Sequence, residues 1–153
     1  MIDGVEIKEL TLRPDDRGMF TEVLKSTDSF VDAHPFAQIS HTVTYPGVVK
    51  AFHWHRIQSD YWYCVTGNIR IGLVDIRPGS PTEGEKMSIC IGEWGRKVVK
   101  IPPGVAHGYQ VLGQEPAQLI YYTTEPYNPQ QPDEERIDWD DPALGFDWTI
   151  RNR

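Results

Sequence analysis

The chain has 153 residues, of which 39% are hydrophobic and 24% are charged, and its formal net charge is -7. This length and composition are typical of one globular domain that can bury a substantial core. The acidic balance excludes a general nucleic-acid-binding protein, because such a protein presents a broad basic face.

Turn and strand signals dominate the chain, which has 13 glycines and 12 prolines at short intervals. Residues 26–32 are compatible with a single helical turn, and Gly67-Asn68 is a turn signal that precedes an alternating apolar segment. The tail over residues 128–141 is rich in proline and acidic residues, and we expect it to form an ordered loop around a barrel. The predicted strands include residues 69–76, 98–101 and 119–124. The sequence therefore predicts one all-β domain over residues 1–153.

Two cysteines, Cys64 and Cys90, are too few for a disulfide framework. Both lie in apolar, strand-like segments, which predicts two small buried hydrophobic side chains. The first residues lack the basic and apolar regions of a signal peptide, and no segment reaches the roughly 18 apolar residues that span a bilayer. We therefore expect the protein in the cytoplasm.

Three of the five histidines lie in two short segments, residues 47–55 and 102–107. Since residues two apart in a strand share a face, His53 and His55 should point the same way and Trp54 the opposite way. The spacing of these histidines and Asp60 resembles the two motifs of the cupin superfamily, with Asp60 where the pattern has Glu. The glycines of the two motifs are Gly47, Gly67, Gly95 and Gly104. The resemblance implies a cupin-type double-stranded β-helix, or jelly-roll, barrel.

Three interpretations of this histidine group remain open at this point. His53, His55, Asp60 and His107 would form a mixed nitrogen and oxygen set suited to a divalent transition metal such as Zn, Mn, Fe or Ni. Alternatively, some of the histidines are structural residues held by hydrogen bonds. Histidine also moves protons near neutral pH, so the group could serve in acid–base chemistry.

A longer set of segments resembles the dTDP-4-dehydrorhamnose 3,5-epimerase family, whose members are cupin-like enzymes of nucleotide-sugar biosynthesis. The resemblance runs from about Asp16 to Trp148. The matching segments are residues 16–22, 36–38, 47–53, 74–84, 101–109, 121–127 and 139–148.

This resemblance implies an isomerase that inverts C3, C5 or both in a 4-keto-6-deoxy sugar nucleotide. Hydrogens next to the C4 ketone are acidic, so a base on one face removes a proton and an acid on the other face returns one. The family's base aligns with His53 and its acid with Tyr121. The resemblance implies no cofactor.

The resemblance also implies how the substrate is bound. Arg17, Phe20 and Glu22 fall where the family holds the nucleotide by phosphate pairing, ring stacking and a contact to the edge of the base. In the family these three come from the partner subunit, which implies a homodimer. The remaining implied substrate-binding residues are Gln38, Lys50, His107 and Tyr127.

One departure from the family keeps other functions open. Asp60 stands where the family has a lysine that stabilises the oxyanion at O4, and a carboxylate there opposes the developing negative charge. The pair His53 and His55, together with Asp60, favours a metal-dependent cupin enzyme, whereas the missing lysine favours a sugar-nucleotide-binding cupin without catalysis. The Arg17, Phe20 and Glu22 group favours the epimerase.

Overall fold

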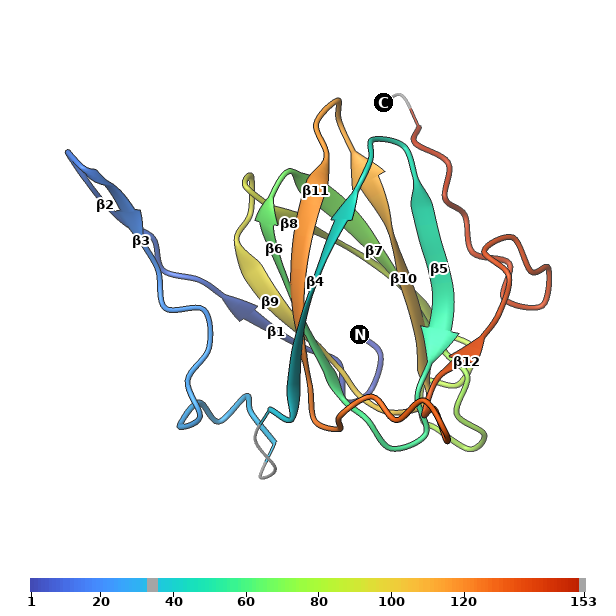
Figure 1. Ribbon diagram of the computed structural model, residues 1–153. Coiled ribbons are helices and arrows are strands. Elements are labelled where there is room, and N and C mark those ends of the chain that lie inside the picture. The colour runs from blue at the N-terminus through green and yellow to red at the C-terminus, as the bar shows by residue number, and fades with distance from the viewer. Residues whose placement is uncertain (33–35, 152–153) are drawn as a thin grey trace.

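The computed structural model describes residues 1–32 and 36–151, which form two five-stranded antiparallel sheets that face each other (Figure 1). The first sheet has the order β1 (Glu6–Glu9), β9 (Lys97–Ile101), β6 (Asp60–Thr66), β11 (Ala117–Thr123) and β4 (Gln38–Thr44). The second has the order β12 (Glu135–Arg136), β5 (Val49–Trp54), β10 (Val105–Leu112), β7 (Asn68–Asp75) and β8 (Lys86–Gly92). A separate hairpin pairs β2 (Arg13–Asp15) with β3 (Gly18–Phe20). The predicted all-β jelly roll is confirmed.

Both faces of the first sheet are covered, which explains why β6 is almost continuously apolar instead of alternating. Trp62 and Cys64 point into the main core between the sheets. Tyr61 and Tyr63 point the other way, into a second cluster that includes Phe30, whose ring centroid lies 5.7 Å from that of Tyr61. The strand that carries Asp60 is thus fixed from both sides.

The tail covers the outer face of the second sheet, beside β5 (Figure 1). Phe146 and Trp148 pack directly on Gly72 of β7, where an added Cβ would lie 2.5 Å from the Trp148 ring. The segment predicted as an ordered loop, residues 128–141, also lies against the barrel, since Ile137 packs on the same cluster. It also contains β12, which the sequence did not predict, and which pairs Arg136 with His53 of β5.

Two sequence-based expectations are wrong in detail. Residues 26–32 form no helical turn: Asp28 N–H donates to the Lys25 carbonyl and Val31 N–H to that of Asp28, as in successive tight turns. Cys64 is buried, but Cys90 is exposed, because on β8 its neighbours Ile89 and Ile91 take the inward-facing positions.

The predicted strands at residues 69–76, 98–101 and 119–124 correspond to β7, β9 and β11. Gly67, with a φ of +71°, forms the predicted turn between β6 and β7, where an added Cβ would lie 2.6 Å from the Pro116 carbonyl oxygen. In the part of the chain that the structure describes, no helix is long and apolar enough to cross a membrane.

Candidate active site

A cavity of about 1130 Å³ opens between the two sheets and is bordered by the tail. Five of the residues that the resemblance implies as catalytic or substrate-binding line it: Gln38 from β4, Lys50 and His53 from β5, Tyr121 from β11, and Tyr127 from the segment after β11. His53 and Tyr121 therefore reach the same space from facing sheets. Tyr127 is 61% exposed, which places it at the rim of the cavity.

The histidines converge beside this cavity as their spacing predicts. His53 and His55 both border the cavity, while Trp54 packs on the opposite side of β5 among the residues under the tail. His107 of β10 is the register partner of His53, and their ring centroids lie 4.1 Å apart. His107 is buried to 1% exposure and lies behind His53, outside the cavity lining.

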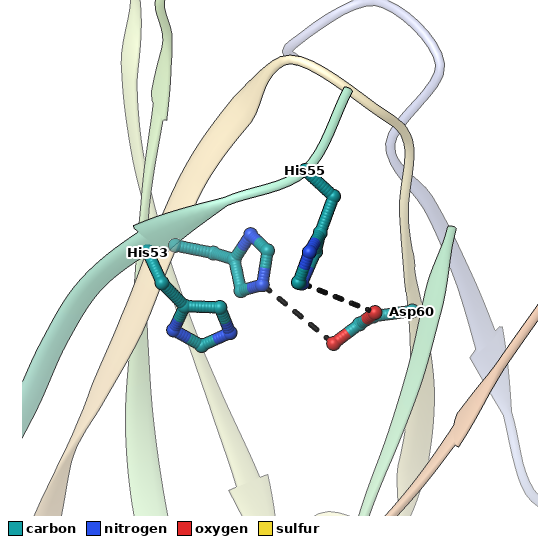
Figure 2. A group of neighbouring side chains, drawn as sticks. His53, His55 and Asp60 are labelled. Carbon is teal, nitrogen blue, oxygen red and sulfur yellow. Dashed lines mark ion pairs between the residues drawn. The ribbon is translucent and has the colours of Figure 1, made fainter. Parts of the chain in front are cut away.

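Asp60 meets these rings from the first sheet and is only 1% exposed. Figure 2 shows its carboxylate facing His55. The carboxylate oxygens lie 3.7 Å from His55 Nε2 and 3.6 Å from His107 Nε2. Its two oxygens accept hydrogen bonds from Gln58 Nε2 at 2.7 Å and Trp62 Nε1 at 3.0 Å. Burial acts to raise the pKa of Asp60, but the neighbouring imidazoles and the indole N–H outweigh it and hold the pKa below its usual value.

Backbone carbonyls fix the orientation of two of the imidazoles. His55 Nδ1 contacts the carbonyl oxygen of Asp133, and His107 Nδ1 lies 2.8 Å from that of Val105. A carbonyl oxygen only accepts hydrogen bonds, so both rings carry a proton on Nδ1. Their Nε2 atoms are consequently the ones that face Asp60.

His53 and Tyr121 have the environments of a proton acceptor and a proton donor. Burial and the neighbouring His107 lower the pKa of His53, so the imidazole is neutral and one ring nitrogen keeps a lone pair. Burial raises the pKa of Tyr121, so the phenol keeps its proton near neutral pH. The pair can therefore take and give a proton across one cavity.

Arg17, Phe20 and Glu22 are not brought to this cavity within one chain. They lie on and just after the β2–β3 hairpin, which extends away from the barrel (Figure 1). Arg17 pairs with Asp15 at 2.6 Å, and Phe20 is 59% exposed. An exposed ring and a guanidinium on a protruding hairpin are free to contact another molecule.

Residues that shape the site but were missed by sequence reasoning include Gln58, Asp133 and Arg136. Gln58 lies between His55 and Asp60 in the chain, so the spacing of that segment was an available signal. The Asp133 carboxylate accepts the backbone N–H groups of Arg56, Ile57 and Gln58 at 2.8–3.0 Å. No local signal could find Asp133, because its partners lie more than 70 residues away in the sequence.

Comparisons with known proteins identify the family of this chain. The family model described as dTDP-4-dehydrorhamnose 3,5-epimerase matches residues 1–153. The chain is 46% identical to the spore coat polysaccharide biosynthesis protein SpsL of Bacillus subtilis, with 100% of both chains covered. It is 40% identical to the probable low-salt glycan biosynthesis epimerase Agl13 of Haloferax volcanii, with 97% of this chain and 95% of that protein covered.

A solved structure is similar over almost the whole fold. It is the epimerase RmlC of Legionella pneumophila in complex with dTDP-4-keto-L-rhamnose, at a TM-score of 0.87 and 29% identity. The match covers 99% of this chain and 82% of that chain. The resemblance inferred from the motifs is therefore confirmed.

Proposed function

Since this chain belongs to the dTDP-4-dehydrorhamnose 3,5-epimerase family, whose members are isomerases of nucleotide-activated sugars, we propose that His53 is its catalytic base and Tyr121 its catalytic acid. The observation that carries the proposal is their placement: β5 and β11 belong to facing sheets, and both side chains line one cavity. Inversion of a carbon centre requires a proton acceptor on one face of the sugar and a donor on the other.

The proposed reaction starts at a hydrogen next to the C4 ketone. The lone pair of His53 takes the proton from C3 or C5, and the electron pair of the broken C–H bond delocalises onto O4. Tyr121 then delivers its proton to the same carbon from the opposite face, which inverts the centre. Return of the His53 proton through solvent to Tyr121 restores both groups. No redox cofactor is needed for this exchange of protons.

The substrate we propose is a dTDP-activated 4-keto-6-deoxy sugar. The similar Legionella enzyme was solved with dTDP-4-keto-L-rhamnose. In this chain Lys50 and Arg136 supply positive charge to the cavity, and Gln38 accepts the backbone N–H of Tyr127 at 2.9 Å, which positions the rim. Charged donors of this kind suit a diphosphate.

We also propose that the protein is a homodimer in which the β2–β3 hairpin of each subunit reaches the cavity of the other. Support comes from the exposed Phe20 and the protruding hairpin, which does not line the cavity of its own chain. Arg17 would then pair with phosphate, Phe20 would stack on the base, and Glu22 would accept from its edge.

Deuterium incorporation from heavy water tests the catalytic assignment. We expect the protein to introduce deuterium at C3, C5 or both in a dTDP-4-keto-6-deoxy sugar, measured by mass spectrometry and NMR. His53→Ala should remove the incorporation, and Tyr121→Phe should lower formation of the inverted product by roughly 10²–10⁴-fold. The matched controls are His41→Ala and Tyr45→Phe, both at exposed positions, which should behave like the parent protein.

A lack of exchange with every such sugar, combined with binding detected by calorimetry, would favour the non-catalytic binding protein instead.

Mixed subunits test the dimer separately. Arg17→Ala and His53→Ala proteins should each be impaired alone, and mixing them should restore activity, because one cavity of the hybrid contains both intact residues. Absence of restoration after verified subunit exchange would contradict the shared site.

A further inference from the structure

We propose that Arg136 is the cationic group that stabilises the negative charge developing on O4 of the sugar, and that Glu134 holds its guanidinium at the cavity. The proposal rests on the epimerase function proposed above, because it assigns a further catalytic residue to that reaction. Removal of a proton next to the C4 ketone places an electron pair on O4, and a preorganised positive charge at that point lowers the barrier. The buried carboxylate of Asp60 has the opposite effect, so the charge has to be stabilised from another position.

The pairing of β12 with β5 places Arg136 beside the proposed base. Arg136 is the register partner of His53. Their neighbours Phe52 and Ile137 exchange two backbone hydrogen bonds, at 2.8 and 3.0 Å. In antiparallel strands such pairs alternate with non-hydrogen-bonded pairs, whose opposite side chains share a face and lie closest together. The Arg136 side chain therefore emerges next to His53, and both side chains line the cavity.

Arg136 and Asp60 act on the base from different sides. In the second sheet β5 lies between β12 and β10, so His53 has Arg136 on one side and His107 on the other. Asp60 approaches the His107 side, where its carboxylate oxygen lies 3.6 Å from His107 Nε2. A sugar oxygen held beside Arg136 therefore lies away from this contact.

Glu134 holds the guanidinium at this position. Its Oε1 accepts a hydrogen bond from Arg136 Nε at 2.8 Å, and both residues line the cavity. The Arg136 side chain is 84% exposed, so a substrate can reach it without displacing other parts of the chain. Because Nε makes the contact to Glu134, the guanidinium can present its terminal N–H groups to a substrate oxygen.

The charges of this pair act on both proposed proton-transfer groups. Burial lowers the pKa of His53 most, and the positive charge of Arg136 acts in the same direction. Burial raises the pKa of Tyr121 most, and the negative charge of Glu134 acts in the same direction. These effects support a position of the pair close to both the base and the acid.

Two other permanent cations line the cavity in the part of the chain that the structure describes, Lys50 and Arg56. Arg56 pairs with Glu135 at 2.6 Å, and its guanidinium lies 5.5 Å from the centroid of the Trp54 ring. Trp54 packs on the side of β5 away from the cavity, so the Arg56 charge is directed to that side.

Lys50 is placed for a different part of the substrate. Its register partner on β10 is Tyr109, two residues beyond the partner of His53, which corresponds to roughly 7 Å along the strand. Lys50 also donates to Thr42 Oγ1 at 3.1 Å. Lys50 therefore suits the diphosphate, whereas Arg136 is the cation beside the base and suits the sugar.

Steady-state kinetics of deuterium incorporation test the role of Arg136, with the dTDP-4-keto-6-deoxy sugar that the parent protein exchanges. Arg136→Ala should lower kcat by roughly 10²–10³-fold and change KM by less than about threefold, because the charge on O4 develops only in the transition state. Arg136→Lys keeps the charge and should be at least about ten times faster than Arg136→Ala. Added guanidinium ion should restore part of the Arg136→Ala rate and leave the parent rate unchanged.

The remaining variants test the positioning of the guanidinium and the fold. Glu134→Ala should lower kcat about fivefold, and Glu134→Gln, which keeps an acceptor oxygen, should recover part of this loss. Arg151→Ala removes another exposed arginine that pairs with a carboxylate, that of Asp147, and should match the parent protein. Since Arg136 is exposed, Arg136→Ala should keep the parent Tm within about 2 °C.

Each outcome decides one point. A parent protein that exchanges deuterium, together with an Arg136→Ala protein that keeps its kcat or raises only KM, overturns the role of Arg136 and leaves the epimerase function in place. A slow Arg136→Ala protein with a clearly lowered Tm and no response to guanidinium ion also overturns it. An unchanged kcat in Glu134→Ala overturns the positioning by Glu134. A parent protein that exchanges no dTDP-4-keto-6-deoxy sugar contradicts the epimerase function itself, and the role of Arg136 with it.

Discussion

Replacing Gly108 by alanine should impair catalysis without touching a catalytic group. Gly108 lies on β10 directly after His107, where the register between β10 and β5 shifts. An added Cβ would lie 2.2 Å from the Cβ of Ala51, 2.6 Å from its Cα and 2.7 Å from the Lys50 carbonyl oxygen. Carbon atoms prefer separations of about 3.5–4.0 Å, so the two strands must move apart by roughly 1 Å.

That displacement gives two measurable consequences. Overpacking of this kind costs about 1–3 kcal/mol, which corresponds to a Tm decrease of roughly 2–12 °C for a chain of this size. Because β5 carries His53, a shift of about 1 Å should slow deuterium incorporation by roughly 100-fold. Differential scanning fluorimetry and the heavy-water assay measure the two effects on the same preparation.

Gly95→Ala is the matched control for this substitution. An added Cβ at position 95 would meet only the Lys97 Cε at 3.7 Å, an ordinary contact, and Gly95 has no positive φ. Its stability should change by less than about 0.5 kcal/mol, and exchange should be unaffected. The reasoning is refuted if Gly108→Ala keeps the parent Tm and an exchange rate within a factor of about three.

Three further substitutions address the framework of the fold. Asp75→Asn should lower the free energy of unfolding by about 3 kcal/mol, measured by urea unfolding at pH 7. The buried Asp75 carboxylate accepts a hydrogen bond from Arg77 at 2.8 Å, and the neutral amide would leave the Arg77 charge without its anionic partner. The Arg77 guanidinium holds the pKa of Asp75 below its ordinary value, although burial opposes this effect. The ionised Asp75 therefore stabilises the fold above about pH 4, and this stabilisation is lost as the pH falls through the lower folded pKa. If the stability of Asp75→Asn falls at low pH in the same way as that of the parent protein, the assignment is contradicted. Asp133→Ala should lower stability by about 1–3 kcal/mol and slow exchange, since three backbone N–H groups lose their acceptor; a variant with unaltered thermal unfolding would show that solvent replaces it. Trp148→Ala should cost about 3–5 kcal/mol through the cavity left over Gly72, and a Tm equal to that of the parent would mean that the tail packing contributes nothing.

Local patterns predicted the parts of the site that depend on one strand. The spacing of His53 and His55 placed both rings on one side of β5, and this is what the structure has. The same kind of pattern was misleading for Cys90, because an apolar segment does not reveal which face of an edge strand is covered.

Contacts between distant segments were beyond the sequence. The Asp133 carbonyl that orients His55, and the pairing of β12 with β5, join residues whose order in the chain says nothing about their proximity. Composition marked this tail only as polar and proline-rich, which is also typical of an unpaired loop. The register of β12 follows from tertiary packing and carries no local signal.

The two-residue strand β12 has a consequence for solubility. It lies along the outer edge of β5, and the backbone of Ile137 continues the pairing by donating to and accepting from Phe52 at 3.0 and 2.8 Å. Open strand edges recruit strands from other molecules and so promote aggregation. A version of the protein cut before β12 would expose that edge, and light scattering should then rise with concentration while the intact chain stays dispersed.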